Sequence, residues 1–301
     1  TMGLVFSSAD ANCGLADGSI DVTTSGGTPG YTYSWSSGCN TSSCTGLAAG
    51  AYTVTVTDLN GCTETGSYAV GNSAGPTGLM TDSTAVTCYG GADGTATVLV
   101  TDGTFPYTYS WSTIPVQTNS SATGLSGGLN SVSVIDANGC STVITVQVDE
   151  PPQIAITITS SDPNCNSSND GFATANPSGG TPGYAYSWNT SPAQTTQSAA
   201  GLSGSSYTVT VTDNLGCNTT QTVSLTAPTA LTYTITENPS TCGGFCDGSA
   251  VIVSFGGTPP YDFLWSNGDS TQFADSLCAG NHVITLTDDN GCTVSTTAQI
   301  T

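Results

Sequence analysis

Cysteines and carboxylates are the side chains in this sequence that could do chemistry. The 301 residues include 12 Cys, 21 Asp and Glu, one His and no Lys or Arg, so the formal net charge is −21. A nucleophilic Ser or Cys needs a neighbouring base, and His282 has no second His or Lys to act with. Paired carboxylates could hydrolyse glycosides, but the aspartates recur at turns, where Asp is common. We therefore predict that the protein is not an enzyme.

The cysteines predict disulfides and hence an oxidising compartment, because their number is even and their spacing recurs. Four pairs have a similar separation along the chain: Cys13 and Cys62, Cys88 and Cys140, Cys165 and Cys217, Cys242 and Cys292. Two further pairs are Cys39 with Cys44, as a small local loop, and Cys246 with Cys278. A zinc site needs clustered Cys or His, which only Cys242 and Cys246 approach, so disulfides are the favoured interpretation.

A second group of candidate ligands lies in the turn before the last cysteine of each pair. Ca²⁺ takes about six to eight oxygen ligands, and each turn offers only part of such a set. The alternative is a hairpin turn in which the Asp side chain binds the backbone. Calcium is thus the one cofactor we consider, with these candidate ligands: Asp58, Asn60, Asp136, Asn138, Asp213, Asp288 and Asn290.

The charge pattern excludes two classes of partner. A protein that binds a nucleic-acid backbone needs Lys or Arg to neutralise phosphates, and this chain has none. An anionic membrane surface would repel a chain of this charge. We expect neither nucleic-acid binding nor direct membrane insertion.

The chemical groups lie on a sequence repeat. Trp35, Trp111, Trp188 and Trp265 recur at a nearly constant interval along the chain. Around each Trp the same order recurs: a Cys, an Asp-Gly pair, a segment such as GGTPGYTYSW, a Leu, an alternating strand and a turn ending in Cys. A fixed period indicates tandem structural units. We predict four modules, at residues 1–72, 73–151, 152–228 and 229–301.

Each module is predicted to be all-β, because apolar and polar residues alternate between Gly- and Pro-rich turns. Strands are expected at residues 3–8, 19–25, 31–36, 41–47, 51–57 and 63–70 of the first module. This pattern is typical of an immunoglobulin-like β-sandwich, and the short joins favour an elongated array of four. The residues expected to form a core stripe, rather than a sugar-binding platform, are Tyr31, Tyr33, Trp35, Tyr107, Tyr109, Trp111, Tyr184, Tyr186, Trp188, Tyr261, Phe263 and Trp265.

A simple up-and-down strand order places both cysteines of the first module at one pole. Cys13 then precedes the second strand and Cys62 the sixth, and these two strands run in the same direction. A disulfide within each module would close a loop of about 50 residues and stabilise it by roughly 4 kcal/mol. The same order puts Cys246 and Cys278 at opposite poles, which conflicts with their pairing.

The combined motif resembles the SprB-type repeat of very large surface adhesins of Bacteroidota, named for a gliding-motility adhesin. It runs from Cys13 through Asp17-Gly18 and the Gly26–Trp35 segment to Cys62, and recurs over essentially the whole chain. The second copy departs from it at residues 102–105, and the fourth at residues 261–264 and His282. The resemblance implies export by a type IX system, display in surface filaments, and O-glycosylation at Ser83, Ser270 and Ser276.

These observations favour an extracellular structural and adhesive protein: a disulfide-stapled, protease-resistant stalk or filament at the bacterial surface. The expected partners are neighbouring modules or further copies, and a surface polysaccharide. The alternatives are a subunit that polymerises non-covalently, end to end or by strand exchange, and a carbohydrate-binding module.

Overall fold

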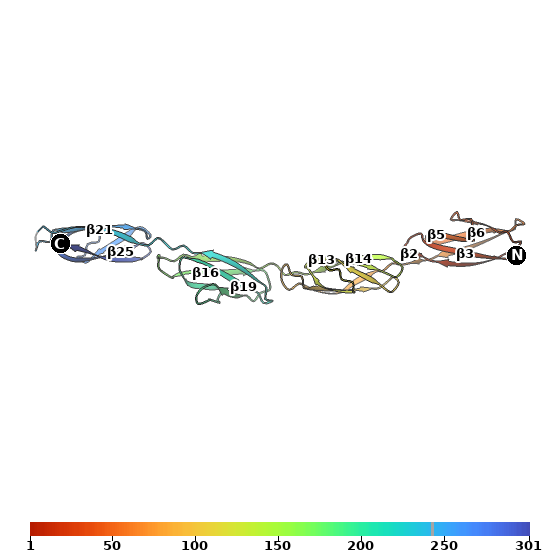
Figure 1. The fold of residues 1–301 in the computed structure, drawn as a ribbon, viewed down its shortest axis with the longest axis horizontal. Helices are drawn as coiled ribbons and strands as arrows, with labels where there is room; N and C mark the ends of the chain where they lie inside the picture. The colour runs from red at the N-terminus through yellow and green to blue at the C-terminus, as the bar shows by residue number, and fades with distance from the viewer. Residues whose placement is uncertain (242–243) are drawn as a thin grey trace. The chain divides into compact units, whose positions relative to one another are not determined.

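The computed structural model describes residues 1–241 and 244–301, and every regular element in them is a β-strand. The chain divides into two compact units, Thr1–Pro151 and Pro152–Thr301, and each unit contains two sandwich modules (Figure 1). No helix long and apolar enough to cross a membrane occurs in the described residues.

The first module is built from two antiparallel sheets of three strands. One sheet has the order β1 (Gly3–Ala9), β3 (Gly18–Ser25), β5 (Ser43–Leu47), and the other has the order β4 (Thr32–Trp35), β6 (Gly50–Thr57), β7 (Thr63–Val70). The six strands predicted from the sequence agree with these bounds to within two residues. A pair of very short strands, β2 (Ala11–Asn12) and β8 (Asn72–Ser73), runs parallel where the chain leaves the module.

The other modules repeat this arrangement, with the first, second and fourth long strands in one sheet and the third, fifth and sixth in the other. The second module contains β9 (Gly78–Thr84), β10 (Gly94–Val100), β11 (Thr108–Trp111), β12 (Ser121–Leu125), β13 (Gly128–Ile135) and β14 (Ser141–Val148). The third contains β15 (Ala155–Ser161), β16 (Gly171–Ser178), β17 (Ala185–Trp188), β18 (Ser198–Leu202), β19 (Ser206–Thr212) and β20 (Asn218–Ser224). The fourth contains β21 (Thr232–Asn238), β22 (Gly248–Phe255), β23 (Tyr261–Trp265), β24 (Phe273–Leu277), β25 (Gly280–Asp288) and β26 (Thr293–Ile300). This division of strands between two sheets is that of an immunoglobulin-like sandwich.

Alternation of side chains along the strands produces the core of each module. In the first module Ile20 and Val22 point inward from one sheet, and Val54 and Val56 from the other. Trp35 lies between them at 4% exposure, and the tryptophans of the other modules are equally buried. Burial of such a side chain contributes about 1.5–3 kcal/mol or more to the stability of the fold. The strand that carries the tryptophan therefore recurs in every module because it supplies a central core residue.

The other predicted aromatic residues lie at the margin of the core. Tyr31 and Tyr33 are half-buried and pack against the buried cluster of the first module. The Tyr31 hydroxyl donates a hydrogen bond of 2.6 Å to the Gly26 carbonyl, and Tyr184 and Tyr261 bind Gly179 and Gly256 in the same way. These tyrosines therefore tie the glycine-rich turn to the sandwich.

The third and fourth long strands of a module run in the same direction, one in each sheet. After β3 the chain turns and β4 runs back, pairing Thr32 with Thr57 and Trp35 with Val54. It then crosses to the other sheet, where β5 pairs Ser43 with Asp21 and Leu47 with Gly18, and so continues in the same direction. We call the end of a module where its first strand begins the entry pole, and the opposite end the exit pole.

Candidate functional site: the disulfide junctions between modules

The disulfides lie at the joints between consecutive modules. Cys13 is bonded to Cys140 in the first unit, and Cys165 to Cys292 in the second. Both pairs are 127 residues apart, with Cα–Cα distances of 5.5 and 5.7 Å. Each bond joins a loop at the exit pole of one module to a hairpin at the entry pole of the next. We call these two bonds, with the loop and hairpin around each, the cysteine junctions.

The predicted pairing of Cys13 with Cys62, and of Cys165 with Cys217, is wrong. The up-and-down strand order counted the third and fourth strands as two opposite passes, whereas β4 and β5 run in the same direction. Cys13 consequently lies at the exit pole and Cys62 at the entry pole of the same module. The remaining recurrent pairs are placed as follows: Cys140 is bonded to Cys13 and not to Cys88, Cys88 and Cys217 are each disulfide-bonded, and Cys242 lies outside the described residues.

The same correction removes the conflict over Cys246 and Cys278. The structure bonds these two residues, because β24 ends at the exit pole where β22 begins. Cys39 and Cys44 form a local disulfide five residues apart in sequence. Cys62 is an exposed free cysteine.

A buried aspartate shapes the hairpin that carries the second cysteine of each module. One carboxylate oxygen of Asp58 accepts hydrogen bonds from the N–H groups of Asn60 (3.0 Å) and Cys62 (2.9 Å). The other oxygen accepts one from Thr28 N–H (3.0 Å) in the glycine-rich turn. Asp136, Asp213 and Asp288 do the same in the other modules, and all four are 4–6% exposed. The aspartate thus fixes the hairpin and, through it, the position of the cysteine.

The glycine before the turn threonine leaves room for this carboxylate. Gly180 has a φ of +61°, and a Cβ added there would lie 2.8 Å from an Asp213 oxygen. Gly257 has the same φ and would approach Asp288 to 2.7 Å. A side chain at either position would meet both a left-handed backbone and a steric clash, which explains the second glycine of each pair.

A second aspartate holds the loop that carries the first cysteine. Asp17 accepts a hydrogen bond from the backbone N–H of Asn12 (2.8 Å), the residue before Cys13. Asp170 accepts bonds from the backbone (3.1 Å) and side chain (2.6 Å) of Asn164, which precedes Cys165. The equivalent bonds of the other modules are made by Asp93 to Thr87 and by Asp247 to Thr241. The recurring Asp-Gly pair therefore closes the cysteine loop.

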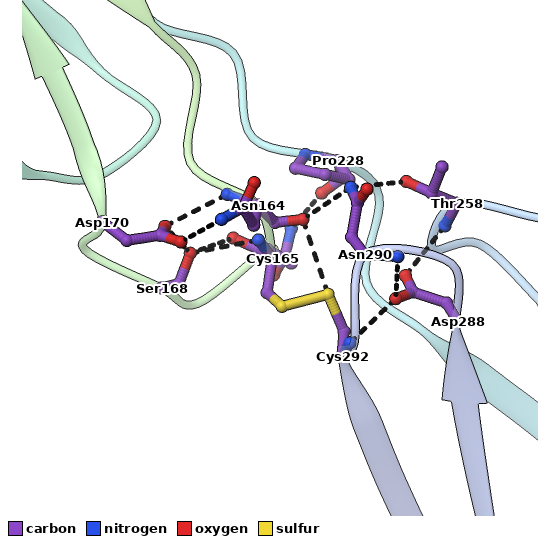
Figure 2. The surroundings of a disulfide bond; sticks show 10 residues. Asn164, Cys165, Ser168, Asp170, Pro228, Thr258, Asp288, Asn290 and Cys292 are labelled. Atoms are coloured by element: carbon purple, nitrogen blue, oxygen red, sulfur yellow. Dashed lines mark hydrogen bonds between the residues drawn. A yellow bond between two sulfur atoms is a disulfide. The ribbon is translucent and has the colours of Figure 1, made fainter.

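Figure 2 shows the two clamped elements meeting at the second junction. The Asn290 side-chain amide donates hydrogen bonds of 3.0 Å to the Asn164 carbonyl and to Thr258 Oγ1, so it reaches across from its own hairpin to the loop of the preceding module. The loop also binds the linker, because Asn166 Nδ2 donates to the Pro228 carbonyl at 2.8 Å. The disulfide is accordingly accompanied by polar contacts on both sides.

The first junction uses the linker more extensively. The loop strand β2 pairs with the linker strand β8, and Cys13 N–H donates to the Ser73 carbonyl at 3.0 Å. Gly14 N–H donates to Asn72 Oδ1 at 2.8 Å, and Cys140 is only 2% exposed. The loop, the linker and the next hairpin are thus joined at one place.

Hydrogen bonds lower the pKa values of seven of these clamping aspartates. For Asp58, Asp136 and Asp213 the largest cause is the N–H of the turn threonine, and it outweighs the opposing effect of desolvation. The backbone of Asn12 lowers the pKa of Asp17, and the side-chain hydroxyls of Thr87, Ser168 and Thr241 lower those of Asp93, Asp170 and Asp247. These carboxylates are therefore ionised as part of the folded structure.

The candidate calcium ligands occupy the hairpins just described. The carboxylates of Asp58, Asp136, Asp213 and Asp288 each accept three backbone hydrogen bonds, and Asn60, Asn138 and Asn290 donate to a turn threonine. No group of three or more His, Cys, Asp or Glu that could hold a metal occurs in residues 1–241 and 244–301. Calcium binding at these hairpins stays a prediction.

Of the remaining sequence candidates, Ser83, Ser276 and His282 lie in β9, β24 and β25, and Ser270 lies between β23 and β24. Ser83, Ser270 and Ser276 are exposed, and their glycosylation stays a prediction. The ring Nε2 of His282 lies 2.8 Å from the Cys278 carbonyl, as the Tyr52 hydroxyl lies 2.9 Å from the Ala48 carbonyl in the first module. His282 is therefore a polar-tipped strand residue that contacts the preceding turn.

Sequence reasoning missed the residue before each first cysteine and the threonine of each glycine-rich turn, which donate to the two aspartates. A signal was present, because the Asp-Gly pair follows the first cysteine by four or five residues in every copy. That spacing suits a closed loop with an Asp side chain bound to its own backbone.

Comparisons with known proteins were made for the whole chain. The SprB repeat family matches residues 5–40, 80–116, 157–193 and 234–270, each span running from the first strand to just beyond the tryptophan. No curated protein sequence matches.

Several solved structures are similar to this chain at low identity and low TM-score. One is a tetra-tandem repeat from the extending region of a large adhesion protein, at 16% identity and a TM-score of 0.32 over all of both chains. Another is the N-terminal eight immunoglobulin domains of Down syndrome cell adhesion molecule, at 10% identity and a TM-score of 0.36. That match covers the whole chain but only 49% of the longer protein. The titin I-band fragment I67–I69 is 13% identical over 74% of this chain, with a TM-score of 0.31.

The family match and the structure coincide module by module. Each matched span contains the Asp-Gly pair, the glycine-rich turn and the tryptophan strand. The chain therefore contains four SprB repeats, each folded as an immunoglobulin-like β-sandwich.

Proposed function

We propose that this protein is an extracellular structural and adhesive protein, a tandem-repeat stalk at the bacterial surface in which modules are covalently joined. The observation that carries the proposal is the bond from Cys13 to Cys140, repeated from Cys165 to Cys292. A linker alone is one connection and permits free bending, whereas a linker and a disulfide make two. Two connections resist bending and twisting of the joint.

The chemistry of the chain suits the outside of a cell. Disulfides persist in oxidising compartments, and trypsin-like proteases have no site in a chain without Lys and Arg. A net charge of −21 favours solubility of an exposed array. The SprB family suggests two more specific parts of this proposal: export by a type IX system and a role in gliding motility.

Labelling of intact producer cells tests the location. An antibody against the repeats, applied with and without permeabilisation, is expected to label intact cells fully. Labelling that appears only after permeabilisation would reject a surface stalk. An antibody against a cytoplasmic protein serves as the control for leakage.

A surface polysaccharide is the ligand class that we propose for adhesion. The second and third modules each have a hollow lined by hydroxyl and amide side chains, including Ser112, Thr113 and Gln117 in one and Asn189, Thr190 and Gln194 in the other. Side chains of this kind are hydrogen-bond partners for sugar hydroxyl groups. Glycan-array binding by the full chain supports the ligand class, and silence across the array rejects it.

A further inference from the structure

The second and third modules differ from the others in the segment that crosses from one sheet to the other. In these two modules the core tryptophan donates from Nε1 to a carbonyl eight residues later, whereas in the first and fourth the acceptor is six residues later. The acceptors are Asn119 and Thr196 in the former pair and Thr41 and Thr271 in the latter. We call the longer segments, residues 112–117 and 189–194, the long crossings.

The two long crossings share one hydrogen-bonded frame. In the second module Thr113 Oγ1 donates to the Pro115 carbonyl (2.9 Å) and accepts from Gln117 N–H (3.2 Å). Gln117 Nε2 donates to the Thr123 carbonyl (2.7 Å), and its Oε1 accepts from Thr123 N–H (3.0 Å). The third module repeats these contacts with Thr190, Pro192, Gln194 and Ala200. A loop that is already fixed loses little freedom when it binds a ligand.

Each long crossing lines one side of a hollow. The hollow of the second module has a volume of about 440 Å³, and that of the third about 460 Å³. The rest of the lining comes mainly from the turn after β12 or β18 and from the residue before the Asp-Gly pair, which is Ala92 or Asn169. Both volumes lie in the range of roughly 300–1,000 Å³ that is usual for small-molecule sites.

A disulfide lies at this place in the fourth module. Cys246 precedes the Asp-Gly pair of that module, as Ala92 does in the second. Cys278 follows the last residue of β24, as Ser126 follows the last residue of β12. The structure bonds Cys246 to Cys278, and the first module holds its shorter crossing segment with a local disulfide. Two modules are thus stapled where the other two have a hollow.

The lining of the hollows is polar and uncharged. The side chains of Thr123 and Ser126 in one hollow, and of Asn169 and Ser191 in the other, are exposed and take no part in the frame of the long crossing. Their hydroxyl and amide groups can donate and accept hydrogen bonds, as sugar hydroxyl groups do. An acidic sugar would meet the aspartate that follows the lining in each module and a formal net charge of −21, and like charges oppose binding. The lining therefore suits a neutral sugar.

We propose that the hollows of the second and third modules each bind a neutral sugar residue of a polysaccharide, and that the first and fourth modules act as spacers. The inference rests on the polysaccharide ligand class proposed above and adds the modules, the lining residues and the charge of the sugar. One chain then has two sites for a short neutral oligosaccharide.

Isothermal titration calorimetry with the full chain measures both the affinity and the number of sites. The probes are short neutral oligosaccharides of glucose, galactose, mannose or xylose, and oligosaccharides of uronic acids of the same length. We expect a neutral oligosaccharide to bind at two sites per chain. The uronic acids should bind more weakly or not at all, and uronic acids that bind as tightly as every neutral probe overturn the proposal.

Tyrosine placed at one equivalent position in three modules makes the test specific. Ala92→Tyr and Asn169→Tyr fill the two hollows, whereas Ala16→Tyr puts the same side chain before the Asp-Gly pair of the first module. All three residues are exposed, so the melting temperature should not change. Each hollow-filling variant should reduce the number of sites from two to one, and the double variant should abolish binding. Ala16→Tyr should keep both sites.

A second variant removes the long crossings themselves. Residues 112–117 and 189–194 are each replaced by residues 266–269, the shorter crossing segment that a sandwich of the same kind already accommodates in the fourth module. Loss of binding together with a cooperative thermal transition would support the sites even where a tyrosine variant does not fold.

Every other outcome overturns the proposal. Unchanged binding in the double tyrosine variant would place the sugar elsewhere, and loss of binding in Ala16→Tyr would contradict the role of the first module as a spacer. Silence of all neutral probes overturns both the sites and the ligand class. The surface stalk is tested separately, because labelling of intact cells does not depend on sugar binding.

Discussion

The cysteine junctions predict that the oxidised chain is almost inextensible. A pulling force applied at the two termini follows the shortest covalent path, which crosses from Cys13 to Cys140 and from Cys165 to Cys292. The load then passes only through the segments 1–13, 140–165 and 292–301, which together are a small part of the chain. The rest of the chain is shielded in two closed loops.

The expected lengths follow from the reach of an extended chain, roughly 3.5 Å per residue. The loaded segments hold about 49 residues and extend to about 170 Å, whereas the whole reduced chain extends to about 1,050 Å. Disulfides within modules would leave about 102 residues under load, and that pattern would extend to about 360 Å. The maximum extension therefore distinguishes an oxidised chain with junction disulfides, an oxidised chain with disulfides within modules, and the reduced chain.

Single-molecule force spectroscopy with handles at both termini measures the difference. The oxidised chain should reach its limit at about 170 Å, without the four equal unfolding steps of independently stapled modules. Dithiothreitol should restore a roughly sixfold longer extension. Cys165→Ser should lengthen the oxidised chain several-fold because it exposes the second loop to load.

The control is the double variant Cys39→Ser, Cys44→Ser. The bond it removes lies inside the first shielded loop, so the oxidised limit should not change. An oxidised wild-type limit of about 360 Å would refute the junctions, and four equal steps would support disulfides within modules instead.

Three further predictions concern the clamping aspartates. Seven of them have lowered pKa values, so the folded state favours their ionised form. Their contribution to stability is complete above the unfolded pKa of about 3.9 and is lost as the pH falls through the folded values. Melting temperatures should thus fall below about pH 4, and a flat profile to pH 2 contradicts this. Gly180→Ala should destabilise the third module by about 2–4 kcal/mol in urea unfolding, from left-handed strain and overpacking against Asp213, whereas Gly216→Ala, with no atom near the added Cβ, should cost about 1–2 kcal/mol. Calcium at the hairpins should raise the melting temperature, and an unchanged value with and without a chelator rejects it.

Strand positions were predictable from the sequence because their signals are local. Alternation in Tyr52–Thr57 and the turn residues Asn60 and Gly61 are each contained within a few residues, and β6 and its hairpin lie where they indicate. The tryptophan strand was likewise found from its period.

The cysteine pairing was not predictable, for two physical reasons. Every cysteine of the recurrent pair returns at the module period, so a bond from Cys13 to Cys62 and one from Cys13 to Cys140 satisfy the same pattern. The choice depends on the pole at which Cys62 lies, and hence on the crossing between β4 and β5. That crossing is fixed by burial of Trp35, whose Nε1 donates to the Thr41 carbonyl at 2.8 Å, and not by any local turn signal.

Placement of the disulfides at joints changes how the modules must be stabilised. The third module has only two cysteines, and Cys165 is bonded to Cys292, so no disulfide closes within it. Its fold depends on a small core that includes Ala173, Trp188 and Val211. A bond that closes a loop of about 100 residues or more contributes about 5 kcal/mol in the chain-entropy model, and here that loop spans two modules. The bond restricts the unfolded chain of either module, so reduction should lower the melting temperatures of both the third and the fourth module.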